Sequence, residues 1–260
     1  MPNRPSKAQQ TTFLEAQHKL ENQGWAIIPN IIPEPFTHKA YEATAQWHRP
    51  QTSHGHPLVQ IPQIRRLQPV FSQLLSLDIW SDIATLVGAE QLRLLQDVVL
   101  IKQSGCQSTV EWHNDHSYTG YLKPDRLFSV RIALSMSTPD NGCLWVLDGS
   151  HHWQQNEQSH FMDNALSSSQ SAEIKATSQN QNRSPVPLAS GDMSIHHCKT
   201  FHASFTNESD APSVVFICHV FDATCQIDSD ALQAAGGTTH FPLTKEGNLC
   251  PETFPLLPLS

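Results

Sequence analysis

The sequence has little of several features that would assign a protein to a familiar class. It has no apolar run long enough to cross a membrane, and its first residues lead into a polar stretch without the apolar core of a secretory signal. Lysine and arginine number 16 against 24 aspartates and glutamates, which gives a formal net charge of −8. This charge argues against nucleic acid or an anionic membrane as a partner. We therefore expect neither.

The sequence also lacks the cysteine spacings that are typical of disulfide-rich or zinc-binding proteins. The six cysteines are scattered, and no two of them form a Cys-x-x-Cys pair. A disulfide framework is not expected in a chain of this length, and a structural zinc site lacks its usual spacing. We expect reduced thiols and a cytoplasmic protein.

Length and composition favour a single domain over residues 1–260. Residues 1–11 are expected to form a flexible tail. Residues 154–184 are dominated by serine, glutamine and asparagine, and such a segment cannot bury enough apolar surface to order itself. We interpret it as a polar insert, either an idle loop or a lid.

The order of the predicted elements indicates a mainly β protein with flanking helices. Helical patterns come first and β-type patterns follow, an order that favours a barrel or sandwich with helices on one side. The predicted helices are within 12–23, 33–47 and 78–87, and the predicted strands are within 25–28, 92–103, 127–135, 143–147, 192–197 and 213–221. Residues 48–66, rich in histidine and proline, are predicted to be a loop.

The most distinctive short motif is Trp112-His-Asn-Asp-His116. On a β-strand, His113 and Asp115 would lie on one face because they are two residues apart. Together with a second histidine further along the chain, for which His202 is the candidate, they would form a two-histidine, one-carboxylate set. Such a set leaves three positions open on a metal and suits non-haem Fe(II).

Several motifs in fixed order give this pattern a wider context. The chain contains Lys102-Gln-Ser-Gly105, then the His-x-Asp motif, then Asn141-Gly-Cys-Leu-Trp-Val-Leu-Asp-Gly-Ser-His151, and finally His202-Ala-Ser204. With these motifs, the sequence resembles the phytanoyl-CoA dioxygenase family of Fe(II)/2-oxoglutarate oxygenases over roughly residues 13–221. Each motif alone is common, but the ordered set is specific.

The resemblance implies a double-stranded β-helix, or jelly-roll, core. It implies that His113, Asp115 and His202 bind Fe(II), that 2-oxoglutarate is the co-substrate, and that O₂ is used to oxidise a small molecule. Halogenating relatives replace the carboxylate ligand with glycine or alanine. Because Asp115 is present, hydroxylation or another oxidation is expected instead of halogenation.

One departure from the family concerns the co-substrate. The family has an arginine, in a Pro-Arg step after the distal histidine, that binds the far carboxylate of 2-oxoglutarate. Here the step is Pro212-Ser213, and no arginine follows Arg183. Ser204 retains the hydroxyl that would help to hold this carboxylate, but a buried dianion still needs a cation.

Two basic residues are candidates for the missing charge. Lys102 lies on the strand before the metal motif, and Arg131 lies on the polar face of the alternating segment 127–135. Two other functions stay open. The chain could be a metal-retaining jelly-roll binding protein without 2-oxoglutarate, or a cupin-like enzyme with another divalent metal. The sequence does not identify the substrate or the oligomeric state.

Overall fold

The computed structural model of the chain describes residues 7–48, 58–154, 183–234, 243 and 249–259. Most of the helical structure precedes the long strands, as the sequence predicts. The longer helices are α1 (Lys7–Gln23), α2 (Glu34–Glu42), α4 (Pro69–Leu75) and α5 (Ile79–Leu86). The shorter helices are α3 (Ile64–Leu67), α6 (His116–Thr119) and α9 (Ser229–Ala234).

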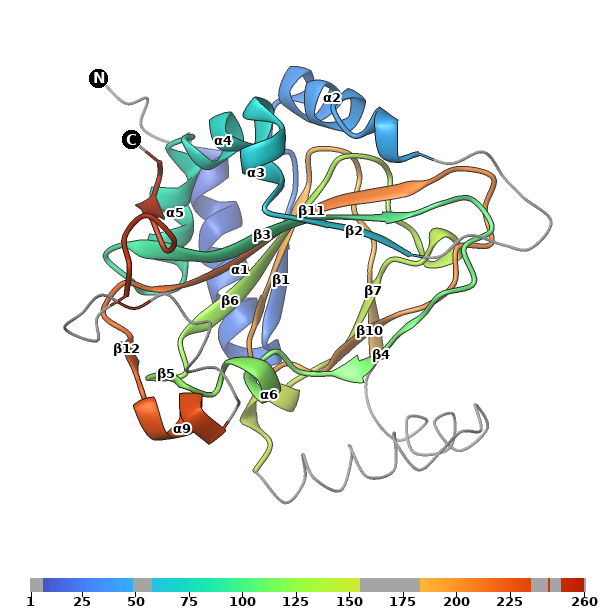
Figure 1. Ribbon diagram of the computed structural model, residues 1–260. Helices are drawn as coiled ribbons and strands as arrows, with labels where there is room; N and C mark the ends of the chain where they lie inside the picture. The colour runs from blue at the N-terminus through green and yellow to red at the C-terminus, as the bar shows by residue number, and fades with distance from the viewer. Residues whose placement is uncertain (1–6, 49–57, 155–182, 235–242, 244–248, 260) are drawn as a thin grey trace.

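A seven-stranded antiparallel sheet forms the larger layer (Figure 1). Its strands follow the order β1-β9-β6-β11-β3-β13, and β2 also pairs with β3. The strands are β1 (Trp25–Ile28), β2 (Val59–Pro62), β3 (Leu92–Lys102), β6 (Leu127–Ala133), β9 (Met193–His197), β11 (Ser213–Asp222) and β13 (Leu256–Leu257).

A second sheet of four strands, in the order β4-β10-β7-β8, lies beside the first (Figure 1). Its strands are β4 (Val110–His113), β7 (Leu144–Leu147), β8 (Arg183–Val186) and β10 (His202–Ser204). A small ladder joins β5 (Leu122–Lys123) to β12 (Gln226–Ile227). Between β3 and β11 the chain crosses repeatedly from one main sheet to the other, which gives the expected double-stranded β-helix.

The two faces of the large sheet have different chemistry because side chains alternate along a strand. In β6, Phe128, Val130 and Ile132 belong to the hydrophobic core that the large sheet shares with the helices. The other face, to which Ser129 and Arg131 belong, is turned toward the small sheet. The helices therefore cover an apolar outer face, and polar side chains of β6 enter the interior of the β-helix.

Two details of the sequence prediction differ from the structure. Helix α1 begins at Lys7, so the predicted tail 1–11 is shortened by residues that are already helical. The predicted loop 48–66 contains β2 and the start of α3. Residues 155–182, which make up most of the predicted insert or lid, lie outside the described residues.

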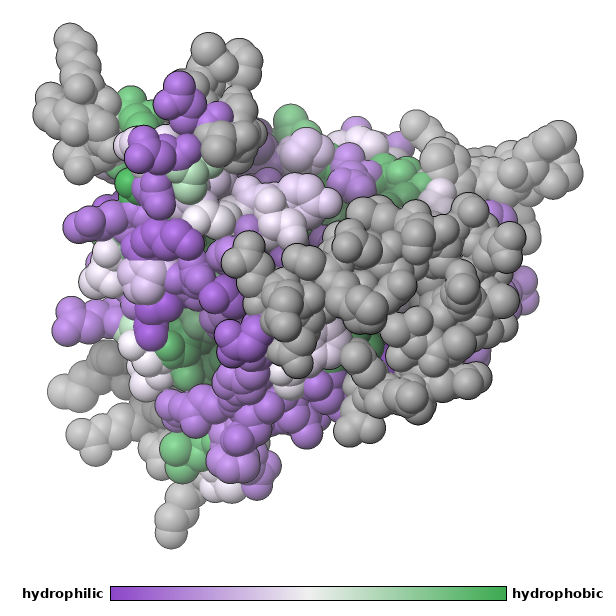
Figure 2. Space-filling view, turned by 90° about the horizontal axis from the view of Figure 1, so that it is seen from below, coloured by the Kyte–Doolittle hydropathy of each residue, from purple (hydrophilic) through white to green (hydrophobic). Residues whose placement is uncertain are grey.

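The surface of the described residues has two simple properties. None of the described helices is long and apolar enough to span a membrane. On the face drawn in Figure 2, hydrophilic residues predominate among those described, and hydrophobic ones form small separate areas.

Candidate metal centre

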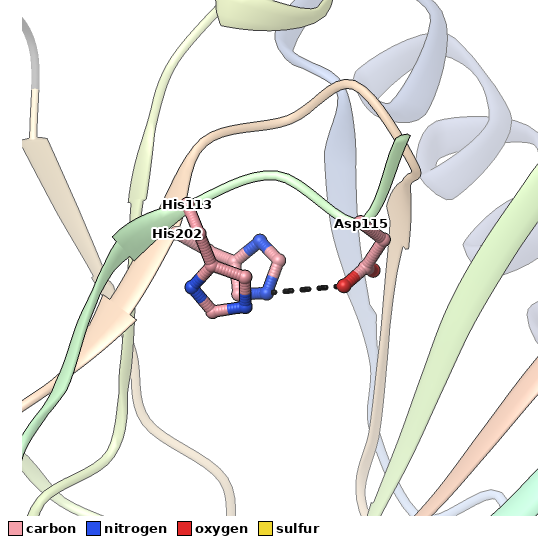
Figure 3. A group of neighbouring side chains, drawn as sticks. All are labelled: His113, Asp115 and His202. Atoms are coloured by element: carbon pink, nitrogen blue, oxygen red, sulfur yellow. Dashed lines mark ion pairs between the residues drawn. The ribbon is translucent and has the colours of Figure 1, made fainter. Parts of the chain in front are cut away.

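The pairing of two short strands places two histidines opposite each other. Strand β4 ends at His113, β10 begins at His202, and these two residues are direct partners in the antiparallel ladder. The chain then turns, and Asp115 precedes the first residue of α6. One ligand atom from each of these three side chains lies within 4.8 Å of the others. Figure 3 shows both imidazoles facing the carboxylate. We call this group the His-Asp-His cluster.

The hydrogen bonds of the two histidines fix which nitrogen is available to a metal. Nδ1 of His113 lies 2.7 Å from the carbonyl oxygen of Glu111, and Nδ1 of His202 lies 2.9 Å from that of Thr200. A carbonyl can only accept a hydrogen bond, so each Nδ1 carries the proton. Each Nε2 therefore presents a lone pair, as it does in histidines that bind metals.

The pKa shifts in the His-Asp-His cluster also favour the protonation states that bind a metal. Burial lowers the pKa of His202 well below its ordinary value, although the nearby Asp115 opposes this effect. Burial alone would raise the pKa of Asp115, but His202, His196 and His219 outweigh it and hold this pKa well below its usual range. At neutral pH the cluster therefore combines a neutral imidazole at His202 with an ionised carboxylate, which suits a divalent metal.

Three further residues surround Asp115 that the sequence did not assign to the site. The Ser129 hydroxyl donates a hydrogen bond of 2.5 Å to Oδ2, and Nε2 of His196 lies 3.4 Å from the same oxygen. Nε2 of His219 lies 4.0 Å from Oδ1. The signal for Ser129 was its position on the same face as Arg131. The phase of His219 with position 213 on the predicted strand 213–221 indicates a side chain that faces inward, whereas His196 could be found only from the register of β9.

Replacing Ser129 with alanine is expected to weaken divalent metal binding about tenfold, because outer partners of metal ligands typically contribute this much. The hydroxyl holds Oδ2, so it leaves Oδ1 facing His202 at 3.7 Å. Titration of the apo protein with Co(II) measures the effect. Ser194→Ala is the matched control, because its buried hydroxyl has no hydrogen-bond partner among the described residues. Equal affinities for the two variants would contradict this role of Ser129.

Lys102 lies inside the β-helix, where its side chain is almost fully buried. Its ammonium group donates a hydrogen bond to the carbonyl oxygen of Phe205. Gly142 makes room for the lysine, since a Cβ at this glycine would lie 2.7 Å from Cδ of Lys102. Burial lowers the pKa of Lys102 to about 8, and the nearby Arg131 contributes to the lowering.

Arg131 is the second interior cation, and its side chain is buried. Burial lowers its pKa to about 10, while Cys143 and Asp115 are close enough to oppose the shift. No hydrogen bond or ion pair joins its guanidinium to another of the described residues. Lys102 and Arg131 also influence each other and the same Cys143 thiol. We call these two residues the cation pair.

Ser204 and Ser213 lie near this cation pair. Ser204 is buried on β10, two residues after His202, and pairs with Leu144 next to Cys143. Ser213 is buried and pairs directly with Lys102. The structure therefore brings Lys102, Arg131 and Ser204 into one interior region. Ser213, which the sequence analysis expects at the position of the family arginine, carries no charge.

Comparison with known proteins identifies the family. Residues 10–213 match the family described as phytanoyl-CoA dioxygenase (PhyH). A relative from Arabidopsis thaliana named phytanoyl-CoA dioxygenase is 25% identical over 160 residues, which cover 62% of this chain and 55% of the relative. The chain therefore aligns with only about half the length of this relative.

Solved structures share the fold across nearly the whole chain. The non-haem alpha-ketoglutarate-dependent epimerase SnoN from nogalamycin biosynthesis has a TM-score of 0.71 at 20% identity, covering 95% of this chain and 99% of SnoN. The carbocyclase SnoK from the same biosynthesis has a TM-score of 0.70 at 21% identity, covering 97% of this chain and 96% of SnoK. These likenesses confirm the jelly-roll fold. With the match over residues 10–213, the chain belongs to the phytanoyl-CoA dioxygenase family.

Proposed function

We propose that the protein is an Fe(II)- and 2-oxoglutarate-dependent oxygenase that hydroxylates or otherwise oxidises a small molecule of specialised metabolism. The observation that carries the proposal is the His-Asp-His cluster, in which two histidines present Nε2 toward an ionised carboxylate. Family membership supports the same activity. A related fold, that of SnoN, has been solved with Fe³⁺, alpha ketoglutarate and nogalamycin RO.

The donor set fits Fe(II) in number and type. Three protein ligands on one side leave open positions for a chelating co-substrate and for O₂. Bound iron would supply the redox chemistry that couples decarboxylation of 2-oxoglutarate to oxidation of the substrate. The chain itself holds the ligands in place: the backbone carbonyls of Glu111 and Thr200 orient the imidazoles, and Ser129 orients the carboxylate.

The cation pair fits the far carboxylate of 2-oxoglutarate. Two positive charges buried close together are unfavourable unless an anion joins them, because desolvation and mutual repulsion both oppose the charged forms. The guanidinium of Arg131 has no partner among the described residues and can bind a carboxylate through two hydrogen bonds. We assign Arg131 as the main contact, with Lys102 and Ser204 completing the subsite.

The presence of the Asp115 carboxylate bears on whether the protein would halogenate or otherwise oxidise its substrate. In a halogenating relative the position of Asp115 would be glycine or alanine, which makes room for a halide. Here Asp115 is buried and held by Ser129, so its carboxylate would be a metal ligand and would leave no such room. The centre therefore favours hydroxylation or another oxidation over halogenation.

Anaerobic addition of Fe(II) and 2-oxoglutarate to the protein tests the proposal. We expect a weak visible charge-transfer band that needs both additions and is absent from a His202→Ala variant. The band reports chelation of 2-oxoglutarate at the metal and needs no knowledge of the substrate. If metal binds but saturating 2-oxoglutarate produces no band, the protein is a binding protein or a cupin-like enzyme, and the proposed function fails.

A further inference from the structure

A row of four polar side chains crosses the interior face of the large sheet at the level of Asp115. Gln96 of β3 pairs with His219 of β11, His219 pairs with Ser129 of β6, and Ser129 pairs with His196 of β9. Neighbours in antiparallel pairs share a face, so all four side chains project toward the metal centre. Ser129 and His196 approach one oxygen of Asp115, and His219 approaches the other.

His219 differs from the rest of this row because it also lines a pocket. The pocket has a volume of about 410 Å³ and reaches Asp115. Its walls combine an apolar part, formed by Leu95, Phe254 and the rings of Tyr118 and Tyr121, with a polar part that includes Gln96 and His219. Among the described residues that line it, Asp115 is the only charged one, and its carboxylate is turned to His113 and His202. The pocket therefore suits an uncharged ligand with an apolar body.

The contacts of His219 direct a proton into this pocket. The side-chain nitrogen of Gln96 lies 3.1 Å from Nδ1 of His219, an arrangement in which the amide donates and Nδ1 accepts. The neutral ring then carries its proton on Nε2, the atom nearest to Asp115. At 4.0 Å from Oδ1, Nε2 is too far away for a hydrogen bond. The proton is therefore available to a ligand.

His219 also lies outside the set of possible metal ligands. Within the part of the chain that the structure describes, the group close enough to hold an ion contains only His113, Asp115 and His202. The side chain of His219 keeps 16% of its surface exposed, whereas that of His196 keeps 2%. A buried histidine of the row can only support Asp115, but His219 can touch a molecule in the pocket.

We propose that this pocket is the substrate subsite and that His219, oriented by Gln96, determines its specificity. His219 donates a hydrogen bond from Nε2 to a carbonyl or hydroxyl oxygen of an uncharged substrate with an apolar body. The apolar part of that substrate packs against Tyr118, Tyr121 and Phe254. The proposal rests on the proposed function, because the ligand of this pocket is a substrate only if the protein is an oxygenase. The binding preference that it predicts does not depend on 2-oxoglutarate.

Binding of two matched bicyclic probes, 1-indanone and indane, tests this role. They differ by a carbonyl oxygen, and both can be followed by saturation-transfer NMR with the Zn(II)-loaded full chain, with and without 2-oxoglutarate. We expect 1-indanone to bind about threefold to tenfold more tightly, the range of one neutral hydrogen bond. In His219→Phe this preference is expected to disappear. In Gln96→Leu it is expected to fall, because the imidazole is no longer oriented.

Tyr118→Leu is the matched control, since it changes the apolar wall and leaves the donor intact. It is expected to weaken both probes equally and to keep their ratio. Failure of both probes to bind, or an unchanged preference in His219→Phe, would overturn the proposal. If His219→Phe does not fold, an unchanged preference in Gln96→Leu overturns it. Because these ratios can be measured without 2-oxoglutarate, they are independent of the charge-transfer band that tests the proposed function.

Discussion

Replacing Asp115 with asparagine is expected to lower Fe(II) affinity by more than about 100-fold, beyond the usual effect of losing an outer partner. Consumption of 2-oxoglutarate is expected to fall below detection. The amide preserves the size of the side chain but removes the only negative charge of the His-Asp-His cluster. Isothermal titration under anaerobic conditions measures the affinity, and succinate formation measures the turnover.

Asp125→Asn is the control, because it makes the same substitution at an aspartate that contacts His116 of α6. The Asp125 carboxylate forms ion pairs with Lys123, Lys199 and His116 but is outside the His-Asp-His cluster. These pairs are partly exposed and contribute little to stability. This variant should bind Fe(II) like the unaltered protein. If Asp115→Asn also bound Fe(II) normally, the metal would have to lie elsewhere, and the assigned centre would be wrong.

The sequence predicted the parts of the fold that depend on local pattern. The alternation in residues 127–135 correctly separated the helix-facing Val130 from the interior Arg131, because a strand in a two-layer fold has two different environments. The His-x-Asp spacing likewise located two residues of the His-Asp-His cluster, although Asp115 lies in the turn after β4 and not on the strand itself, as the sequence had predicted. Such features need no information about distant segments.

The features that the sequence did not predict depend on which strands pair and in what register. Strand β2 was predicted to be a loop because its pattern is short and rich in prolines, yet pairing with β3 stabilises it. His219 faces Asp115 only because β11 lies beside β6 in a register that places His219 opposite Ser129. A shift of one residue would turn this imidazole to the helical side. No local pattern encodes that register.

Replacing Arg131 with methionine is expected to weaken 2-oxoglutarate binding at least about 100-fold, the loss of a bidentate contact between two buried charges. The same change is expected to raise the free energy of unfolding of the apo protein by about 1–3 kcal/mol. The reason is that burial already disfavours the charged guanidinium, whose pKa is lowered to about 10. A purely structural arginine would give the opposite sign.

The charge state of Lys102 adds a pH-dependent measurement to this test. Its pKa of about 8 means that the ammonium group loses its proton above this pH, so 2-oxoglutarate affinity should fall there. Arg131 contributes to that low pKa, and removing it should move the fall in affinity to higher pH. Titrations of 2-oxoglutarate between pH 6.5 and about 9.5 in both proteins measure the change.

Arg126→Met is the matched control for Arg131→Met, because Arg126 precedes the same strand but is bound to Asp222 and to the carbonyl oxygens of Val87 and Gly88. Its loss should lower the thermal midpoint and leave 2-oxoglutarate affinity unchanged. The two arginine variants should therefore move stability in opposite directions. Normal 2-oxoglutarate affinity in Arg131→Met would remove this residue from the co-substrate site. The same result in Lys102→Met as well would exclude the cation pair as the anchor, and with it the assignment of 2-oxoglutarate.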